Sequence, residues 1–245
     1  MGTSRTASAG PGDLLIFDSA KEGAIDVFPW HKFENIIDCT GVIDYRNTKE
    51  SIETNIEGNV IIPLSILNKL KKEQRYFYCS THAVLIPKDF RTAYASSKLS
   101  FEERIMRNGN FAAKITIFRL PALFSETRKS GLIYKIKQHF LKKEKLELDI
   151  KFSAWHTMEI SRAATIVLAI VNQGSLEKLI TIGYPTETSL EKIIRSAEKV
   201  FDYKITISFI KNESDHYTPD ISTQNKYVSV AANDFEKDLT AYFRR

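Results

Sequence analysis

The chain has 245 residues, 43% of them hydrophobic and 27% charged, which fits one sizeable α/β domain with or without a small lobe. Because no apolar run reaches the roughly 20 residues of a membrane span and no signal peptide opens the chain, we expect a cytoplasmic protein that binds no membrane. The net charge is +5, but the lysines alternate with acids, so we expect a solvated surface rather than a nucleic-acid site.

The two cysteines, Cys39 and Cys79, each end a strand-like run. They fit small buried core residues better than a disulfide framework. No cluster of histidine and cysteine accompanies them, so we expect no metal site.

Strand and helix patterns alternate along the chain. Residues 1–12 are small and polar and are expected to form a flexible start. Strands are expected at 13–18 and 35–41, with a weaker one at 24–28, and a helix that can kink at Pro63 is expected over 50–72. The later expected elements are strand 75–81, helix 93–108, strand 113–120, helices 131–142 and 157–173, strand 178–182, helix 188–201, strand 204–209, a loop over 211–226 and helix 231–243. This alternation predicts a doubly wound parallel sheet.

The segment Tyr94-Ala-Ser-Ser-Lys98 is the pattern that most strongly indicates chemistry. A tyrosine and a lysine four residues apart on a helix share one face, and the lysine charge would lower the pKa of the phenol from its usual value of about 10. Thr81, at the end of strand 75–81, could hold a substrate oxygen while Tyr94 moves the proton. The spacing alone is not sufficient, because Tyr45 and Lys49 have the same spacing without such a context.

Six motifs, one of which is the segment Tyr94–Lys98, follow one another in chain order. They are Ile36-Ile-Asp-Cys-Thr-Gly41, Asn55-Ile-Glu-Gly-Asn59, Phe77-Tyr-Cys-Ser-Thr-His-Ala-Val84, Tyr94-x-x-Ser-Lys98, Phe118-Arg-Leu-Pro-Ala-Leu-Phe124, and Ile182-Gly183 before Ser189-Leu-Glu. In this order they resemble the extended short-chain dehydrogenase/reductase family, which includes sugar-nucleotide epimerases, dehydratases and reductases. The resemblance covers about residues 24–200.

The resemblance implies an α/β, Rossmann-like fold in one domain, 13–245. Its core would comprise about 13–120 and 151–177, and its small substrate lobe about 121–150 and 178–226. It also implies NAD(P)-dependent oxidation, reduction, epimerisation or dehydration of a hydroxyl- or keto-bearing small molecule, expected to be a nucleotide sugar, with the hydride supplied by the cofactor. A homodimer through helices 51–70 and 93–108 is implied as well.

The same resemblance implies roles for individual residues. Tyr94 would be the general acid/base, Lys98 would bind the nicotinamide ribose, Thr81 would orient the substrate and Asn55 would support the proton relay. The implied cofactor-binding residues are Asp18, Thr40, Gly41, Tyr94, Lys98 and Pro121, and the implied substrate-binding residues are Thr81, His82 and Ala122. Each has a structural alternative: Thr81 can cap a turn, Asn55 can bond its own helix, and Gly41 can serve a tight turn.

The N-terminal region departs from the family pattern. No glycine-rich turn is present, and only 35 residues precede Ile36. Either 13–18 is the second strand, with Asp18 as the ribose-binding acid and the first strand missing, or it is the first strand, followed by a loop with too few glycines. In both cases the pyrophosphate cradle is reduced. The choice between NAD and NADP stays open, and the alternative is a degenerate binding or partner protein that binds no dinucleotide productively.

Overall fold

The computed structural model forms two compact units, which are described one by one. The first unit is Met1–Ser80 with Pro87–Ile117, and the second is Thr81–Ile86 with Phe118–Arg245. The residues that the structure describes are 2–4, 14–16, 18–19, 21–107, 109–148, 156–186, 189–209 and 219–245. The predicted division into a core and a substrate lobe stays a prediction.

Parallel strands form the centre of the first unit. β3 (Asn35–Asp38) pairs in parallel with β4 (Arg75–Thr81), and Asp38 lies opposite Tyr78. Tyr76, Phe77 and Tyr78 are all buried, as expected for a strand covered on both faces. β5 (Lys114–Leu120) follows β4 in the sheet and continues into the second unit, where β9 (Leu179–Thr181) is its next neighbour. The predicted parallel α/β sheet is confirmed.

One long helical run with an unusual middle turn covers this sheet. It consists of α2 (Lys49–Ile56), a π-helical segment (Glu57–Ile61) and α3 (Ile62–Leu67). The Ile62 N–H donates to the carbonyl of Glu57, five residues earlier, which is the bond of a π turn. The helix predicted over 50–72 is thus interrupted just before Pro63, the second residue of α3, and it ends at Leu67. A kink at Pro63 stays a prediction.

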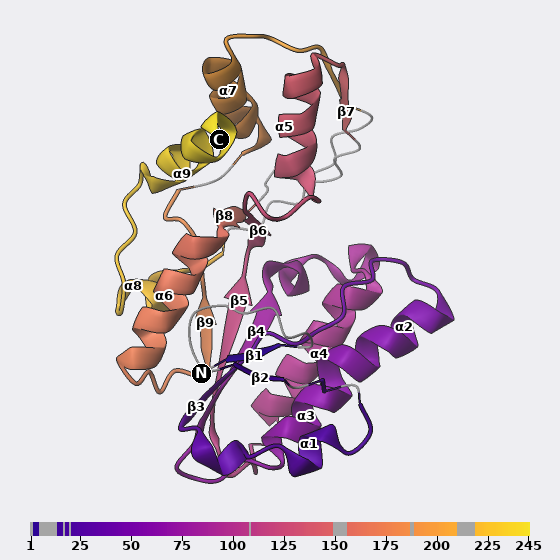
Figure 1. Ribbon diagram of the computed structural model, residues 1–245, viewed down its shortest axis with the longest axis vertical. Helices are drawn as coiled ribbons and strands as arrows, with labels where there is room; N and C mark the ends of the chain where they lie inside the picture. Colours follow the sequence, from indigo (N-terminus) through magenta and orange to yellow (C-terminus); the bar gives the residue numbers. More distant parts are fainter. Residues whose placement is uncertain are drawn as a thin grey trace. The chain divides into compact units, whose positions relative to one another are not determined.

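Helix α4 (Ala93–Arg107) matches the predicted helix 93–108 closely and packs against α2 and the π-helical segment. Figure 1 shows these helices together on one side of β3 and β4. The Phe101 ring lies with its centroid 4.0 Å from that of Tyr78, so the apolar face of α4 is anchored on β4. This packing fixes the position of α4 along β4.

Shorter elements precede this sheet. β1 (Gly2–Ser4) pairs in parallel with β2 (Leu14–Ile16) in a separate two-stranded sheet, so a strand lies within the segment expected to be a flexible start, and 5–13 lie outside the described residues. The weak strand predicted at 24–28 is wrong, because this stretch forms helix α1 (Ala24–Val27). Gly23, the residue before this helix, has a left-handed backbone conformation with φ 72°. Val27 is 82% exposed, so its side chain is not packed on a sheet as a strand residue would be.

The second unit combines short parallel strand pairs with helices. β6 (Ala122–Phe124) pairs with β8 (Thr157–Glu159), and β7 (Leu146–Leu148) pairs with β10 (Ile207–Phe209). Its helices are α5 (Leu132–Lys142), α6 (Ile160–Asn172), α7 (Leu190–Phe201), α8 (Ser222–Asn225) and α9 (Asp234–Arg244). α7 packs against both α5 and α9, and the Phe140 and Phe201 rings stack at 5.4 Å.

Two expectations for this unit need correction. The helix predicted over 157–173 begins only at Ile160, because the Glu159 side chain accepts from the Ser161 and Arg162 N–H groups and caps α6 there. The loop predicted over 211–226 contains helix α8, and 210–218 lie outside the described residues. Throughout the described part of the chain, no helix is long and apolar enough to cross a membrane.

Candidate active site at the carboxyl ends of β3 and β4

A buried lysine lies at the centre of the site. Lys98 of α4 is 3% exposed, and its Nζ donates to the Cys79 carbonyl at 2.9 Å. The same ammonium lies 4.4 Å above the Tyr78 ring, so it gains a cation–π contact. Burial lowers the pKa of Lys98, while the charges of Asp38 and Glu102 oppose that shift. The structure thus holds a desolvated cation next to the end of β4.

Tyr94 lies one turn before Lys98 on α4 and is half-buried. Its ring packs edge-on against Tyr45, with centroids 5.7 Å apart, and its carbonyl accepts a hydrogen bond from Ser97 Oγ at 2.8 Å. Asn47 Oδ1 accepts from the Ala93 N–H at 2.7 Å and so fixes the start of the helix. The predicted tyrosine and lysine therefore share one helix in the first unit.

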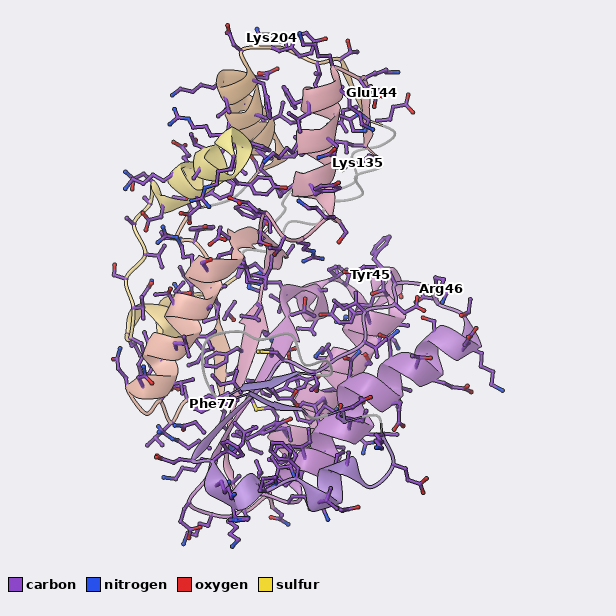
Figure 2. The ribbon with its side chains drawn as sticks, in the orientation of Figure 1. Tyr45, Arg46, Phe77, Lys135, Glu144 and Lys204 are labelled. Atoms are coloured by element: carbon purple, nitrogen blue, oxygen red, sulfur yellow. The ribbon has the colours of Figure 1, made fainter. Side chains whose placement is uncertain are left out.

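The second pair with this spacing, Tyr45 and Lys49, is in a different environment. Tyr45 belongs to the loop before α2, and Figure 2 shows it and Arg46 projecting outward from the unit. Lys49 opens α2 with a side chain that is 91% exposed. The spacing of the two pairs is the same, but only Lys98 is desolvated.

Asn59 joins the site to the loop after β3. The residue is fully buried in the π-helical segment, and its Oδ1 accepts from the Val42 N–H at 3.1 Å. Its Nδ2 donates to the Val42 carbonyl at 2.9 Å, to Asn55 Oδ1 at 3.2 Å and to Ser97 Oγ at 3.0 Å. Asn59 therefore ties this loop to α4 at the residue before Lys98. Asn59 is not among the predicted site residues, although two asparagines four residues apart in an apolar helix are a usable sequence signal.

Asn55, the residue expected to support the relay, makes mainly local contacts. Its Nδ2 donates to the Ser51 carbonyl at 2.8 Å and to the Asp44 carbonyl at 2.9 Å. It reaches the site through its acceptor oxygen, which binds Asn59. These bonds agree with the structural alternative for Asn55, and its part in a relay stays a proposal.

Gly41 lies where a side chain would collide with Asn59 and Lys98. Its φ is +157°, and a Cβ added there would lie 2.8 Å from Asn59 Oδ1 and 3.2 Å from Lys98 Nζ. The space on that side of the Gly41 backbone is therefore filled by Asn59 and Lys98. Glycine, which has no side chain, allows the loop after β3 to approach both residues this closely.

The preceding residues hold this loop in place. Asp38 is buried and accepts from the Thr40 N–H at 2.8 Å, from Thr40 Oγ1 at 2.5 Å and from the Tyr76 hydroxyl. Burial, reinforced by the Asp38 charge, raises the pKa of Tyr76 well above its usual value. Thr40 is therefore fixed next to Gly41 by a carboxylate that is itself hydrogen-bonded on both oxygens.

The remaining predicted cofactor residues lie in both units. Asp18 follows β2 in a turn of the first unit, where its carbonyl accepts from the Lys21 N–H at 3.1 Å. Pro121 lies between β5 and β6 in the second unit and is buried.

The predicted substrate residues all belong to the second unit. Thr81 ends β4, and its Oγ1 accepts from the Ala83 N–H at 3.2 Å, as in the capping alternative. His82 is buried with its ring 5.8 Å from that of His156, and burial together with the His156 charge lowers its pKa to about 3. Ala122 is exposed at the start of β6, where its carbonyl accepts from Thr157 Oγ1 at 2.7 Å.

The cysteines differ from the expectation. Cys39 is exposed rather than buried, Cys79 is partly buried, and both are free thiols with their Sγ atoms 3.5 Å apart. Within the described ranges, no group of three or more histidine, cysteine or acidic side chains is arranged to hold a metal ion.

Comparisons with known proteins relate these features to solved structures. No family model and no curated protein matches the sequence. UDP-glucuronic acid 4-epimerase from Bacillus cereus, solved with NAD and a fluorinated UDP-glucuronic acid, is 17% identical, with a TM-score of 0.76 over 94% of this chain and 80% of that one. UDP-N-acetylglucosamine 4-epimerase from Methanobrevibacter ruminantium is 13% identical, with a TM-score of 0.73 over 94% of this chain and 82% of that one.

A third match is the NAD-dependent NDP-hexosamine 5,6-dehydratase TunA, which is 13% identical with a TM-score of 0.72 over 95% of this chain and 89% of that one. Structural neighbours of the chain are thus NAD-dependent nucleotide-sugar epimerases and dehydratases. They confirm the Rossmann-like fold that the motifs predicted.

Proposed function

We propose that the chain is a NAD(P)-dependent oxidoreductase of the epimerase or dehydratase type that acts on a hydroxyl- or keto-bearing nucleotide sugar. The observation that carries this proposal is the buried Lys98 ammonium, which lies one helical turn from Tyr94 and beside the backbone of Gly41. The similar B. cereus epimerase binds NAD and a UDP-sugar.

In this mechanism Tyr94 gives a proton to the substrate oxygen or removes one from it. The charge of Lys98 favours the phenolate, and its ammonium would also bind the ribose of the dinucleotide, with Thr40 and Gly41 beside it. Thr81 would orient the substrate oxygen. When bound, the dinucleotide supplies the hydride.

The other residues would act around this centre. Asn55 and Asn59 would position the loop after β3. Asp18 would bind a ribose, Pro121 would line the cofactor site, and His82 and Ala122 would line the substrate site.

We expect dinucleotide binding to be weak. The sequence has no glycine-rich turn, and only residues 5–13, nine in all, connect the parallel strands β1 and β2, fewer than the dozen or so of an ordinary crossover. Two lost charge-assisted contacts, at about 1.5–3 kcal/mol each, would weaken binding by roughly a hundredfold or more. Calorimetry should give a dissociation constant of about 0.1 mM or higher for both NAD and NADP.

Two lysine variants test whether Lys98 contributes to dinucleotide binding. Lys98→Met should weaken the binding further, because it removes the charge beside Gly41. Lys49→Met changes an exposed lysine of the same spacing pattern and should leave the affinity unchanged. Low-micromolar affinity in the wild type would show that the N-terminal region holds the pyrophosphate after all.

The reaction itself is tested with a panel of UDP- and TDP-sugars at millimolar NAD or NADP. Chromatography should detect an epimer, a dehydrated sugar or an oxidised sugar with at least one substrate. If no sugar is converted and neither dinucleotide binds, the proposal fails. The short connection between β1 and β2 favours a second candidate in that case, a binding or partner protein that keeps the fold without the cofactor.

We also propose a homodimer through α2, α3 and α4. Not every apolar side chain of these helices can lie in the interface, because Val60, Leu67, Phe101 and Ile105 are buried in the core. Ile56 and Met106 remain available, at 40% and 49% exposure.

Light scattering should therefore detect a dimer of the 28.0 kDa chain at micromolar concentration. The double variant Ile56→Lys/Met106→Lys should shift it to monomers, because two charges would replace apolar contacts in the interface. Val27→Lys, on exposed α1, is the matched control and should leave the dimer intact. A wild-type monomer at this concentration would contradict the expectation.

A further inference from the structure

We propose that Cys39 and Cys79 form a peroxide-sensitive thiol pair that closes reversibly into an intramolecular disulfide at the edge of the sheet. The proposed reaction of Tyr94 and Lys98 uses neither thiol. Hydrogen peroxide, or another hydroperoxide, is the oxidant.

The geometry of the pair suits a disulfide. The register of β3 on β4 places Asp38 opposite Tyr78, so the next position on each strand brings Cys39 beside Cys79. Neighbouring strands lie about 4.8 Å apart, within the Cα separations of roughly 4.4–6.8 Å found in disulfides. Side chains paired in this way point to the same face of a sheet, and the two Sγ atoms are 3.5 Å apart.

Only a small movement is needed to form the bond. The sulfur atoms must approach by about 1.5 Å to reach the S–S bond length of about 2.05 Å. Cys39 directly follows the last residue of β3, so the ladder that holds Asp38 does not include it. Closure can therefore occur by adjustment of the loop residue without breaking the pairing of β3 with β4.

The two thiols have different chemical roles. Cys39 is the exposed member, and the hydrogen bond donated by the Cys79 thiol lowers its pKa. The Lys98 charge adds to this shift, while burial and the Asp38 charge oppose it. The same interaction and burial raise the pKa of Cys79. Since the thiolate is the form that reacts with peroxide, Cys39 is the attacking sulfur and Cys79 is the resolving one.

The reaction proceeds in two balanced steps. The Cys39 thiolate attacks one peroxide oxygen, the O–O bond breaks, and hydroxide leaves and takes up a proton, which yields a sulfenic acid and one water. Cys79 then loses its proton and attacks the Cys39 sulfur, the S–O bond breaks, and the released hydroxide forms a second water. Two thiols are thus oxidised by two electrons while one hydrogen peroxide is reduced to two waters.

The purified full chain provides a direct test, because these are its two cysteines. After treatment with a small excess of hydrogen peroxide, the thiol titre should fall from two per chain to zero, and dithiothreitol should restore it. Trypsin places the cysteines in separate peptides, 33–46 and 76–88, so a non-reducing digest should contain these two peptides linked. The oxidised protein should keep the mass of one chain less two hydrogens.

Single variants identify the order of the steps. Cys79→Ser should stop at the sulfenic acid on Cys39, which dimedone traps as a covalent adduct. Cys39→Ser should react with peroxide at least tenfold more slowly than the wild type, because the remaining thiol is less exposed and has lost its partner. A titre that stays at two, a disulfide that links two chains, or a Cys39→Ser variant that reacts as fast as the wild type would each overturn the proposal. All these readouts are independent of dinucleotide binding.

Discussion

Replacing Tyr94 with phenylalanine should lower turnover by about 10²–10⁴-fold, the usual cost of a lost acid–base group. The variant keeps the aromatic ring and therefore its edge-on packing against Tyr45, so we expect little change in melting temperature. The measurement is kcat on whichever nucleotide sugar the panel identifies, with thermal unfolding recorded on the same preparations.

Tyr45→Phe is the matched control for this change. Tyr45 has the same spacing to a lysine and contacts the same ring, but Lys49 is exposed where Lys98 is buried. Its turnover should stay within about twofold of the wild type. Activity that survives Tyr94→Phe would exclude the phenol as the proton carrier, even though the fold would be unaffected.

The largest loss of stability is expected from Asn59→Ala. The substitution removes one acceptor and one amide donor that together bind Val42, Asn55 and Ser97 in a fully buried position. Because each buried polar group left without a partner costs about 1–3 kcal/mol, the free energy of unfolding should fall by about 3–5 kcal/mol. Urea denaturation of the two proteins measures this difference.

Asn68→Ala is the control for that experiment, since Asn68 is exposed at the end of α3. Its free energy of unfolding should change by no more than about 0.5 kcal/mol. A loss below about 1 kcal/mol for Asn59→Ala would mean that the loop after β3 keeps its position without this side chain.

Local patterns in the sequence were sufficient for the main elements of the first unit. The apolar run at Arg75–Thr81 and the helical spacing at Ala93–Arg107 each predicted an element to within one residue. These patterns are reliable because a parallel strand buried on both faces is a continuous apolar run. A helix buried on one face has its apolar residues at helical spacing. The stretch 24–28 failed because β-branched residues also occur in a short exposed helix when no sheet edge is available.

The site was predictable only in part. The spacing of Tyr94 and Lys98 can be recognised in the sequence. The burial of Lys98, which distinguishes it from the exposed Lys49, depends on the packing of α4 against β4. The role of Asn59 depends on a loop residue 17 positions earlier, Val42, which no local pattern connects to it. The contact between the two thiols likewise requires the register of β3 on β4, across 40 positions of sequence.

The π turn at Glu57–Ile61 has a consequence for sequence alignment. A π turn accommodates one residue more than an α turn, and each residue of an α-helix advances by about 100° around the axis. Deleting one residue here would rotate α3 by that angle relative to α2, and the Asn59 carbonyl, which accepts from the Tyr78 hydroxyl at 2.8 Å, would turn away from β4. Any alignment of this run with an uninterrupted helix must therefore place a one-residue gap between 57 and 61, or it will compare residues on different faces.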